Sequence, residues 1–268
     1  MISLARPPKI IPRFIQYNYS YLVSISMSWY TARLHPKIYE PSYLTRKQIK
    51  NAIQKFIHTE IGSKKEYTIV DLGCGDAPYK SLFHNYAKYI GVDIEAYTDV
   101  DIVAKMWDIP LPDNSVDFLL STEVIEHSEK PKETIAEICR ILKPGGKALL
   151  TIPFLYPLHG SDDRWRFTIH GLSQLMGEEK KHTCSIRPSN GFFITYGQLF
   201  NVLLMHIPFG RYFYPISFPI NCVSLASDWL FKQSVFIMRP FVTKEQFSQI
   251  RKSLLESFPI RYIVTITK

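Results

Sequence analysis

The loop Asp71–Gly75 reads Asp-Leu-Gly-Cys-Gly and directly follows a short apolar run. Its two glycines, Gly73 and Gly75, permit a tight turn and let the backbone approach a ligand closely. A dinucleotide-binding loop would carry a third glycine where this chain has Pro78, because that glycine makes room for a pyrophosphate. The loop therefore predicts a site for a ligand without phosphates, although a plain strand-to-helix turn can have the same spelling.

Two further acidic residues stand where a bound nucleoside would need them. Asp93 ends the apolar run Tyr89–Asp93 and lies 20 residues after Gly73. A carboxylate at the tip of a second strand can accept hydrogen bonds from both hydroxyls of a ribose, whereas without a ligand it would face solvent. Asp108 lies in Trp107–Pro112, where an acid beside an apolar residue can hold an adenine amino group. We expect Asp93 to bind ribose and regard Asp108 as the weaker signal.

The segment Glu123–His127 reads Glu-Val-Ile-Glu-His and follows a predicted strand. Three interpretations stay open. Glu123 and His127 can line the ligand pocket, with His127 as general base, a task that suits a neutral imidazole. The two glutamates and His127 can instead bind a divalent metal ion. In the third interpretation the segment is a structural cap, with Glu126 and His127 hydrogen-bonded locally.

A second histidine, His159, lies in a loop with the charged cluster Asp162–Arg166. Loops at the carboxyl ends of strands commonly build the pocket for a substrate. His159 can take a proton from a hydroxyl group, and Arg164 and Arg166 can hold an anionic group. A loop tied together by surface ion pairs would have the same composition. His127 and His159 are the two predicted catalytic residues.

These side chains must be positioned by strands and helices in alternation. Apolar runs predict strands at Tyr67–Leu72, Tyr89–Asp93, Asp101–Ala104, Val116–Ser121, Lys147–Pro153, Thr183–Arg187 and Ile260–Thr267. Helical spacing predicts helices at residues 42–61, 78–86, 132–142 and 171–176, and the sequence Lys-Pro-Gly-Gly at 143–146 ends the third of these. Strands that alternate with helices imply an α/β fold with a doubly wound, mostly parallel, seven-stranded sheet.

Two segments differ in composition from the rest of the chain: residues 1–65 are basic, and residues 192–240 are hydrophobic. The net charge is +8, and residues 1–65 hold 11 lysines and arginines but only two acidic residues. We expect residues 1–41 to form a basic, irregular arm that meets anionic lipid, nucleic acid or a phosphorylated substrate, unless it is a solvated surface. Residues 192–240 form an aromatic-rich hydrophobic insert before the last strand. It can pack as a lid over the sheet or contact lipid.

Several classes of protein are disfavoured by composition. The four cysteines show no close spacing, which argues against a zinc site or a disulfide framework and suits a reducing compartment. Neither a signal peptide nor a transmembrane run is expected. We predict a cytoplasmic protein with peripheral membrane contact as a further option, and nucleic acid as an unfavoured partner because residues 66–268 lack an excess of basic residues.

Four motifs, taken in order, resemble those of class I methyltransferases that use S-adenosyl-L-methionine (SAM). They are Val70–Gly75, Gly91–Asp93, Asp108–Pro112 and Leu142–Gly146. The resemblance covers about residues 66–153 and is strongest to the broad subgroup that includes ubiquinone-pathway enzymes. It implies a Rossmann-like methyltransferase domain over residues 42–268. It also implies that Gly73 and Gly75 lie against the methionine part of SAM, Asp71 near its amino group, Asp93 at the ribose and Asp108 at the adenine. In the first interpretation of the segment Glu123–His127, Glu123 lines the same cofactor pocket.

Two narrower resemblances bear on the acceptor. The Glu-x-x-Glu-His spelling is similar to metal sites of some ubiquinone-pathway and small-RNA methyltransferases, with His159 as a further ligand; no metal site is assigned on this basis. The loop Pro153–Thr168 resembles methyltransferases of bacterial surface-polysaccharide and sugar-modifying clusters. We expect methyl transfer to oxygen of a small-molecule, sugar or lipid-linked acceptor. The alternatives are an RNA methyltransferase with a metal-assisted site and a SAM-binding partner protein without catalysis.

Overall fold

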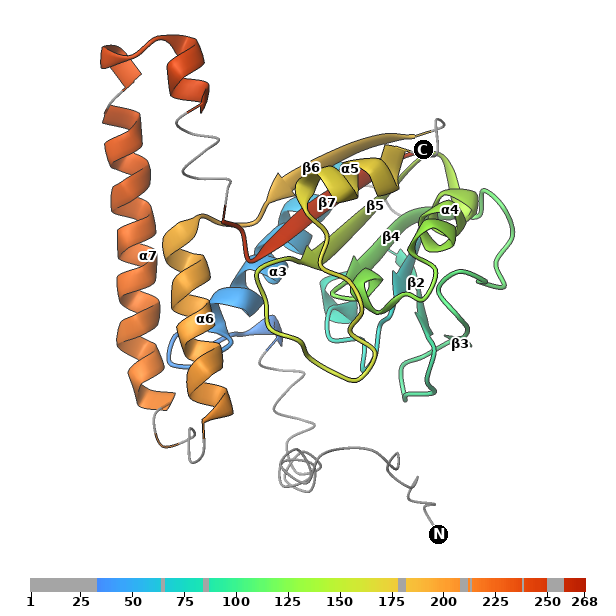
Figure 1. The fold of residues 1–268 in the computed structure, drawn as a ribbon. Coiled ribbons are helices and arrows are strands. Elements are labelled where there is room, and N and C mark those ends of the chain that lie inside the picture. The colour runs from blue at the N-terminus through green and yellow to red at the C-terminus, as the bar shows by residue number, and fades with distance from the viewer. Residues whose placement is uncertain are drawn as a thin grey trace.

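Seven strands form one mixed sheet in the order β3-β2-β1-β4-β5-β7-β6 (Figure 1). The computed structural model describes residues 33–63, 66–83, 87–177, 182–207, 212, 214–237, 239–249 and 258–268. The strands are β1 Tyr67–Leu72, β2 Ala87–Asp93, β3 Ile102–Val103, β4 Val116–Thr122, β5 Leu142–Pro153, β6 Thr183–Pro188 and β7 Arg261–Thr267. All neighbouring strands from β3 to β5 are parallel, whereas β7 runs antiparallel to both β5 and β6.

Helices cover both faces of this sheet and extend beyond it. They are α3 Tyr43–Phe56, α4 Pro131–Ile141, α5 Ile169–Gly177, α6 Phe192–His206 and α7 Tyr214–Ile237. The helix α3 continues into a π-helical turn, Ile57–Ile61, and short 3-10 turns occupy Lys80–Phe83, Ile125–His127 and Arg239–Phe241. Figure 1 shows α6 and α7 side by side as a hairpin that stands away from the sheet, with α6 next to α3.

Two hydrophobic layers, one on each face, fix the sheet between its helices. On one face, Ile135 and Ile138 of α4 and Leu172 of α5 pack against strand residues such as Leu72 and Leu150. On the other face, the helix α3 buries the side chains Ile49, Ile53 and Phe56 against strand residues Tyr67, Ile69, Phe118 and Leu120. These strands are buried on both faces, which explains why they read as continuous apolar runs and not as alternating ones.

The order of the strands creates a crevice at the carboxyl edge of the sheet. The chain moves outward from β1 to β2 and β3, then returns to place β4 on the other side of β1. In open α/β sheets, ligands bind outside the carboxyl ends of the strands where this reversal occurs. The residues that follow β1 and β4 therefore stand at the expected ligand position.

The predicted α/β fold with a doubly wound, seven-stranded sheet is confirmed, and most element bounds agree within two residues. The strand β5 begins five residues earlier than predicted, because Leu142 already pairs with Val116 before the Lys-Pro-Gly-Gly loop. The helix predicted at 78–86 is only the 3-10 turn Lys80–Phe83, and residues 84–86 lie outside the described part of the chain. Within the predicted arm 1–41, the structure describes only residues 33–41, where Leu34 and Pro41 are buried against the domain.

The hydrophobic insert predicted at 192–240 is a pair of helices, α6 and α7, joined near residue 212. Among the described helices, none combines the length and the apolar character that a bilayer crossing requires. Cys74, Cys139, Cys184 and Cys222 are free thiols, in agreement with the prediction that they form no disulfide framework.

Candidate functional site

The glycine loop leaves β1 in a conformation that depends on Gly73. Its φ angle is +73°, in the left-handed region that favours glycine, and a Cβ atom placed there would lie 2.3 Å from a side-chain carbon of Val124. The amide of Gly73 donates a hydrogen bond to the carbonyl of Val92 at 2.8 Å. The loop after β1 is therefore held between the ends of β2 and β4, the two strands that flank it.

The carboxylate of Asp93 holds the second glycine of this loop. Its Oδ2 accepts a hydrogen bond from the amide of Gly75 at 2.8 Å, and its Oδ1 accepts one from the amide of Glu95 at 3.2 Å. A carboxylate offers about four acceptor positions, so both oxygens retain capacity for a ligand hydroxyl. The structure thus places Asp93 beside the loop, as the sequence predicts, and adds a loop-ordering role that the spacing alone did not indicate.

Asp71, at the end of β1, is buried and only 2% exposed. The hydroxyl of Tyr89 donates a short hydrogen bond to its carboxylate. Burial raises the pKa of Asp71 to about 7, although the hydrogen bond from Tyr89 acts in the opposite direction. This carboxyl group, two residues before Gly73, consequently loses its proton near neutral pH.

The raised pKa of Asp71 predicts that the unliganded protein loses stability as the pH rises. The folded chain keeps this proton up to about pH 7, whereas the ordinary pKa is 3.8, so the folded state binds more protons between these values. Between pH 5 and pH 8 we expect the unfolding free energy of the wild type to fall by roughly 3 kcal/mol because of Asp71. The variant Asp71→Asn has no such group and should not show this fall. Urea denaturation at each pH measures this, and parallel pH profiles for the two proteins would contradict it.

The segment around Asp108 is a turn that two side chains of α4 hold in place by hydrogen bonds. Glu137 accepts a hydrogen bond from the amide of Ile109 at 2.7 Å. Arg140 donates to the carbonyls of Ile109 and Leu111 at 2.9 and 2.8 Å. The side chain of Asp108 itself lies at the surface, where it remains available to a ligand. Glu137 and Arg140 were not singled out from the sequence, and only their spacing of three residues on a helix signals the pair.

Glu123 follows β4 with a φ angle of +56° and is paired with a distant arginine. Arg261, at the start of β7, donates to both carboxylate oxygens of Glu123 at 3.2 Å, and Thr151 donates to Oε1 at 2.9 Å. Arg261 is 1% exposed and also donates to the carbonyl of Thr45 in α3. The pair therefore joins β4, β7 and α3, and sequence reasoning missed Arg261, whose signal is a lone arginine beside an apolar strand.

Removal of Arg261 is expected to destabilise the fold strongly. The variant Arg261→Met fills a similar space but leaves Glu123 without its partner, so we expect the unfolding free energy to fall by about 3 kcal/mol. The matched control is Arg187→Met on the adjacent strand β6, where the arginine is exposed and a change within about 0.5 kcal/mol is expected. Chemical denaturation compares the two, and equal stability of both variants would show that the buried pair contributes little.

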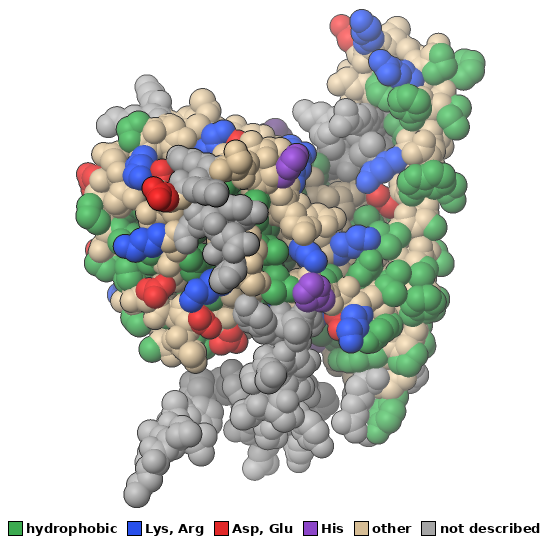
Figure 2. Space-filling model, turned by 180° about the vertical axis from the view of Figure 1, so that it is seen from behind, with side chains coloured by type: hydrophobic (Ala, Val, Ile, Leu, Met, Phe, Trp, Pro, Cys, Tyr) green, Lys and Arg blue, Asp and Glu red, His purple; other side chains and the backbone are tan. Residues whose placement is uncertain are grey.

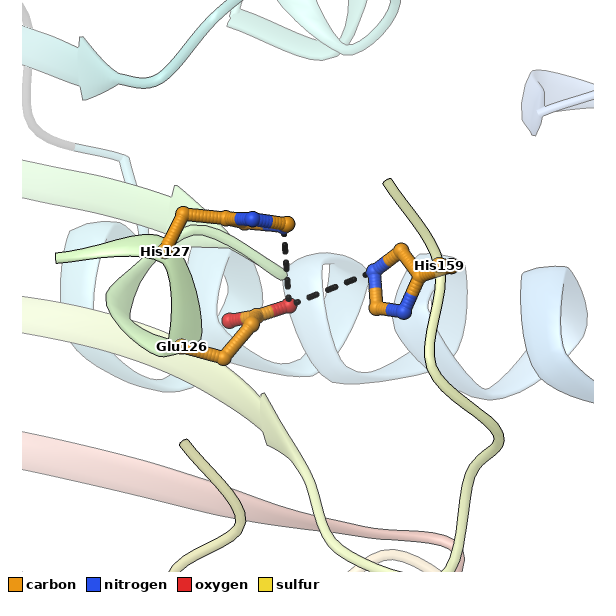
Figure 3. Close-up of side chains that lie close together, drawn as sticks. All are labelled: Glu126, His127 and His159. Atoms are coloured by element: carbon orange, nitrogen blue, oxygen red, sulfur yellow. Dashed lines mark ion pairs between the residues drawn. The ribbon is translucent and has the colours of Figure 1, made fainter. Parts of the chain in front are cut away.

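Glu126, His127 and His159 form a compact cluster at the same edge of the sheet (Figure 3). Glu126 Oε1 lies 3.8 Å from Nε2 of His127 and 3.7 Å from Nε2 of His159. The glutamate side chain is fully buried, and neither of its oxygens has a hydrogen-bond partner among the residues that the structure describes. Burial raises the pKa of Glu126 well above its ordinary value, and the nearby Glu123 carboxylate adds to the rise. Figure 3 shows both imidazoles turned toward this one oxygen.

A second carboxylate lies close to the other ring nitrogen of each histidine in the cluster. Nδ1 of His127 lies 3.3 Å from Asp162, and Nδ1 of His159 lies 3.1 Å from Asp163. These carboxylates place negative charge beside both imidazoles. Nε2 of each ring faces the buried side chain of Glu126, so the centre of the cluster can receive a proton or a cation.

The arrangement supports two kinds of chemistry. The cluster can take a proton from a nearby hydroxyl group and share it among three acceptors, which is the task of a general base. The same ligand atoms lie within 4.8 Å of one another, a donor set of two imidazoles and one carboxylate that first-row divalent ions accept. The predicted pair His127 and His159 is therefore brought together, and the full burial of Glu126 is the feature that the sequence did not reveal.

The arginines predicted to hold an anionic group are occupied within the loop. Arg166 pairs with the buried carboxylate of Asp163 and donates to the carbonyl of Tyr156 at 3.1 Å. Arg164 lies 3.1 Å from Glu129 at the surface. The predicted alternative of a loop tied together by ion pairs thus describes the observed contacts, and they orient His159 through Asp163, which also accepts from the His159 amide at 2.9 Å.

Comparisons with known proteins agree with this geometry. The family model described as a methyltransferase domain matches residues 70–150, from the glycine loop to β5. A probable S-adenosylmethionine-dependent methyltransferase of Mycolicibacterium smegmatis is 28% identical over 132 residues, which cover 45% of this chain and 49% of that protein. An uncharacterised methyltransferase of Mycobacterium avium is 31% identical over 97 residues, 31% of this chain and 38% of that protein. The chain thus matches half or less of the length of these relatives.

A solved structure shares the fold over nearly the whole chain. A SAM-dependent methyltransferase from Archaeoglobus fulgidus aligns with a TM-score of 0.51 and 13% identity, over 94% of this chain and 100% of that chain. At this identity the likeness shows a common fold and not a common substrate.

Proposed function

We propose that this chain is a class I SAM-dependent methyltransferase, as the methyltransferase-domain match over residues 70–150 supports, and that it transfers the methyl group of SAM to an oxygen atom of its acceptor. The observation that carries the proposal is the cluster of the buried Glu126 with the partly exposed His127 and His159 at the carboxyl edge of the sheet. Transfer to oxygen is the form of the reaction that requires a base, because a hydroxyl group must lose its proton.

The residues at this edge have the chemistry that SAM requires. Asp93 has acceptor capacity for the ribose hydroxyls, and the exposed Asp108 is free to meet the adenine amino group. Gly73 and Gly75 give the loop the close approach that the methionine part needs. Asp71 and Glu123, which carry buried or paired carboxylates, would act on the cofactor through their charge and through the loops that they order.

The chain's own residues would position the acceptor and accept its proton. SAM supplies a methyl group that its sulfonium already activates. The acceptor hydroxyl would be aligned with the methyl–sulfur bond, and most of the rate gain should come from this alignment. The acceptor oxygen would take the methyl group, the cofactor would leave as a thioether, and the hydroxyl proton would pass to the cluster. Asp163, 3.1 Å from Nδ1 of His159, would position that ring, and Asp162 lies 3.3 Å from Nδ1 of His127.

The acceptor is proposed to be a small molecule, a sugar or a lipid-linked hydroxyl compound. Arg166 pairs with Asp163 of its own loop and Arg164 with Glu129 next to α4, which disfavours an acceptor held mainly by its anionic groups. Trp165, half-exposed at 40%, and the neighbouring Phe167 stack with ring centroids 5.7 Å apart. Stacked aromatic rings beside a polar cluster can cover the apolar face of a sugar ring or an isoprenoid chain.

Methyl transfer from isotope-labelled SAM tests the proposal. The purified chain would be incubated with sets of monosaccharide glycosides, polyprenyl-linked sugars, phenols and a short RNA, and mass spectrometry would locate the label. We expect label on oxygen of a hydroxyl acceptor. Label on RNA or on nitrogen would contradict the proposed acceptor, and SAM binding without transfer to any set would favour a partner protein without catalysis.

A further inference from the structure

The helical hairpin of α6 and α7 has a polar interior. Its two helices contain only two formally charged residues, Asp228 and Lys232, which pair with each other at 2.6 Å. The residues of α7 that face inward are Ser217, Asn221, Ser224, Asp228 and Val235, spaced as one helical stripe. The buried residues of α6 are mixed, with the polar Thr195, Gln198 and Asn201 among the apolar Ile194, Val202 and Leu204. A hairpin that folds in water normally buries an apolar stripe, so the pattern is reversed.

Small residues and side-chain hydrogen bonds hold the two helices together. Asn201 donates to the side chain of Asn221 at 2.8 Å within the buried seam. A Cβ atom at Gly197 would lie 1.9 Å from Oγ of Ser224, so glycine is required for the close approach of the helices. Close contact at small residues, with polar side chains bonded across the seam, is how helices associate in an apolar medium.

The outer surface of the hairpin, in contrast to its buried seam, is largely apolar. Large hydrophobic side chains on α7 are exposed, among them Phe218, Val223, Trp229, Leu230, Phe236 and Ile237. Figure 2 shows hydrophobic side chains gathered along the length of α7. Trp229 is 60% exposed and Ile237 66% exposed. Water does not favour a contiguous apolar face of this kind, and such faces mark contacts with lipid or protein.

Positive charge next to this face indicates which contact it makes. A hollow at the end of α7 is lined by Lys232, Arg239 and Lys244 beside Phe236 and Phe247, and no acidic side chain lines it in the described part of the chain. On the other side of the hairpin, α3 carries Lys50 and Lys55 and contains no acidic residue. Cations above apolar side chains complement anionic headgroups above acyl chains.

We propose that the α6–α7 hairpin docks on the surface of an anionic lipid bilayer, with the apolar side of α7 in the acyl boundary and with Arg239 and Lys244 of the hollow facing lipid headgroups. The hairpin lies in the interface and does not cross the bilayer. Gln198 of α6 hydrogen-bonds the backbone of Pro41 and Thr45, and Thr45 accepts from Arg261, which holds Glu123. These contacts connect the docked hairpin rigidly to the catalytic edge of the sheet.

Flotation of the full chain with vesicles tests this inference. Vesicles of phosphatidylcholine alone and of phosphatidylcholine with phosphatidylglycerol would be compared. We expect the wild type to float with the anionic vesicles and to bind the neutral ones less. The double variant Trp229→Glu/Phe236→Glu should partition on the order of 100-fold less, because two large side chains no longer leave water. The matched control, Gln174→Glu, adds an equal charge per site on the exposed face of α5 and should float like the wild type.

Three other results would overturn the inference. They are failure of the wild type to float with either vesicle composition, flotation of the double variant equal to that of the control, and a stable dimer in light scattering that the double variant breaks, which would assign the face to a second copy. Thermal unfolding and SAM binding of each variant in the absence of vesicles verify that the fold and the cofactor site are intact. Failure of vesicle binding is thereby separated from failure of the proposed methyl transfer.

Discussion

The variant Glu126→Gln is expected to lower the turnover number for methyl transfer by at least about 100-fold, with SAM affinity unchanged within a factor of about two. Glutamine keeps the shape of the buried side chain but replaces the carboxyl group toward which both imidazoles are turned with an amide that cannot accept a proton. His127→Ala and His159→Ala should each lose about 100- to 10,000-fold, because each removes one proton acceptor from the cluster. The measurement is single-turnover methyl transfer at saturating SAM.

Its matched control is His170→Ala on α5, where the histidine is exposed and full activity is expected. The pH profile separates a base from a merely structural cluster. Since the pKa of Glu126 is raised, the cluster carries its proton at low pH, and turnover should rise with pH through one apparent pKa of the coupled group. Glu126→Gln should shift that profile. Activity that disappears after treatment with EDTA and returns with Mn²⁺ or Zn²⁺ would instead identify the cluster as a metal site.

Asp93→Asn is expected to weaken SAM binding roughly 100-fold, because a neutral amide replaces a charged acceptor of two ribose hydroxyls. The amide oxygen can still accept from Gly75, so the loop conformation should be retained. The control Asp99→Asn removes a carboxylate from the same loop region, where it pairs only with the half-exposed Lys80 at 3.0 Å. Titration calorimetry of both variants is the measurement. Equal affinities for the two variants would show that Asp93 orders the loop without touching the ribose.

Much of the fold could be predicted because the strands carry a strong local signal. The strand β1 has the predicted bounds, Tyr67–Leu72, since both of its faces are buried and its sequence is continuously apolar. The start of β5 could not be predicted, because Leu142 joins the sheet through one pair with Val116 and a bulge follows. Pairing of this kind depends on the neighbouring strand and leaves no trace in local spacing.

The candidate site could be predicted where it lies on one strand end and not where distant segments meet. Gly73, Gly75 and Asp93 lie together at the carboxyl edge, as the motifs indicated. The contact between His127 and His159 joins residues 32 positions apart and depends on the course of the loop after β5. Arg261 was missed because its partner Glu123 lies 138 residues away.

The hairpin shows a different limit of sequence reasoning. The composition of residues 192–240 indicated a hydrophobic insert, but the polar residues of α7 recur at helical spacing among apolar ones. An apolar stripe is normally read as the buried face of a helix. In α7 the buried stripe is the mostly polar one. Periodicity alone would therefore have predicted the wrong face of the helix to be buried. Only the contact between Asn201 and Asn221 reveals which side faces inward.

The most direct test of the account is titration calorimetry of the full chain with SAM, with and without EDTA. The arrangement of Gly73, Gly75 and Asp93 predicts saturable binding at a single site, with the same affinity in both conditions. The absence of saturable binding in both conditions would contradict the proposed cofactor site and with it the proposed methyl transfer.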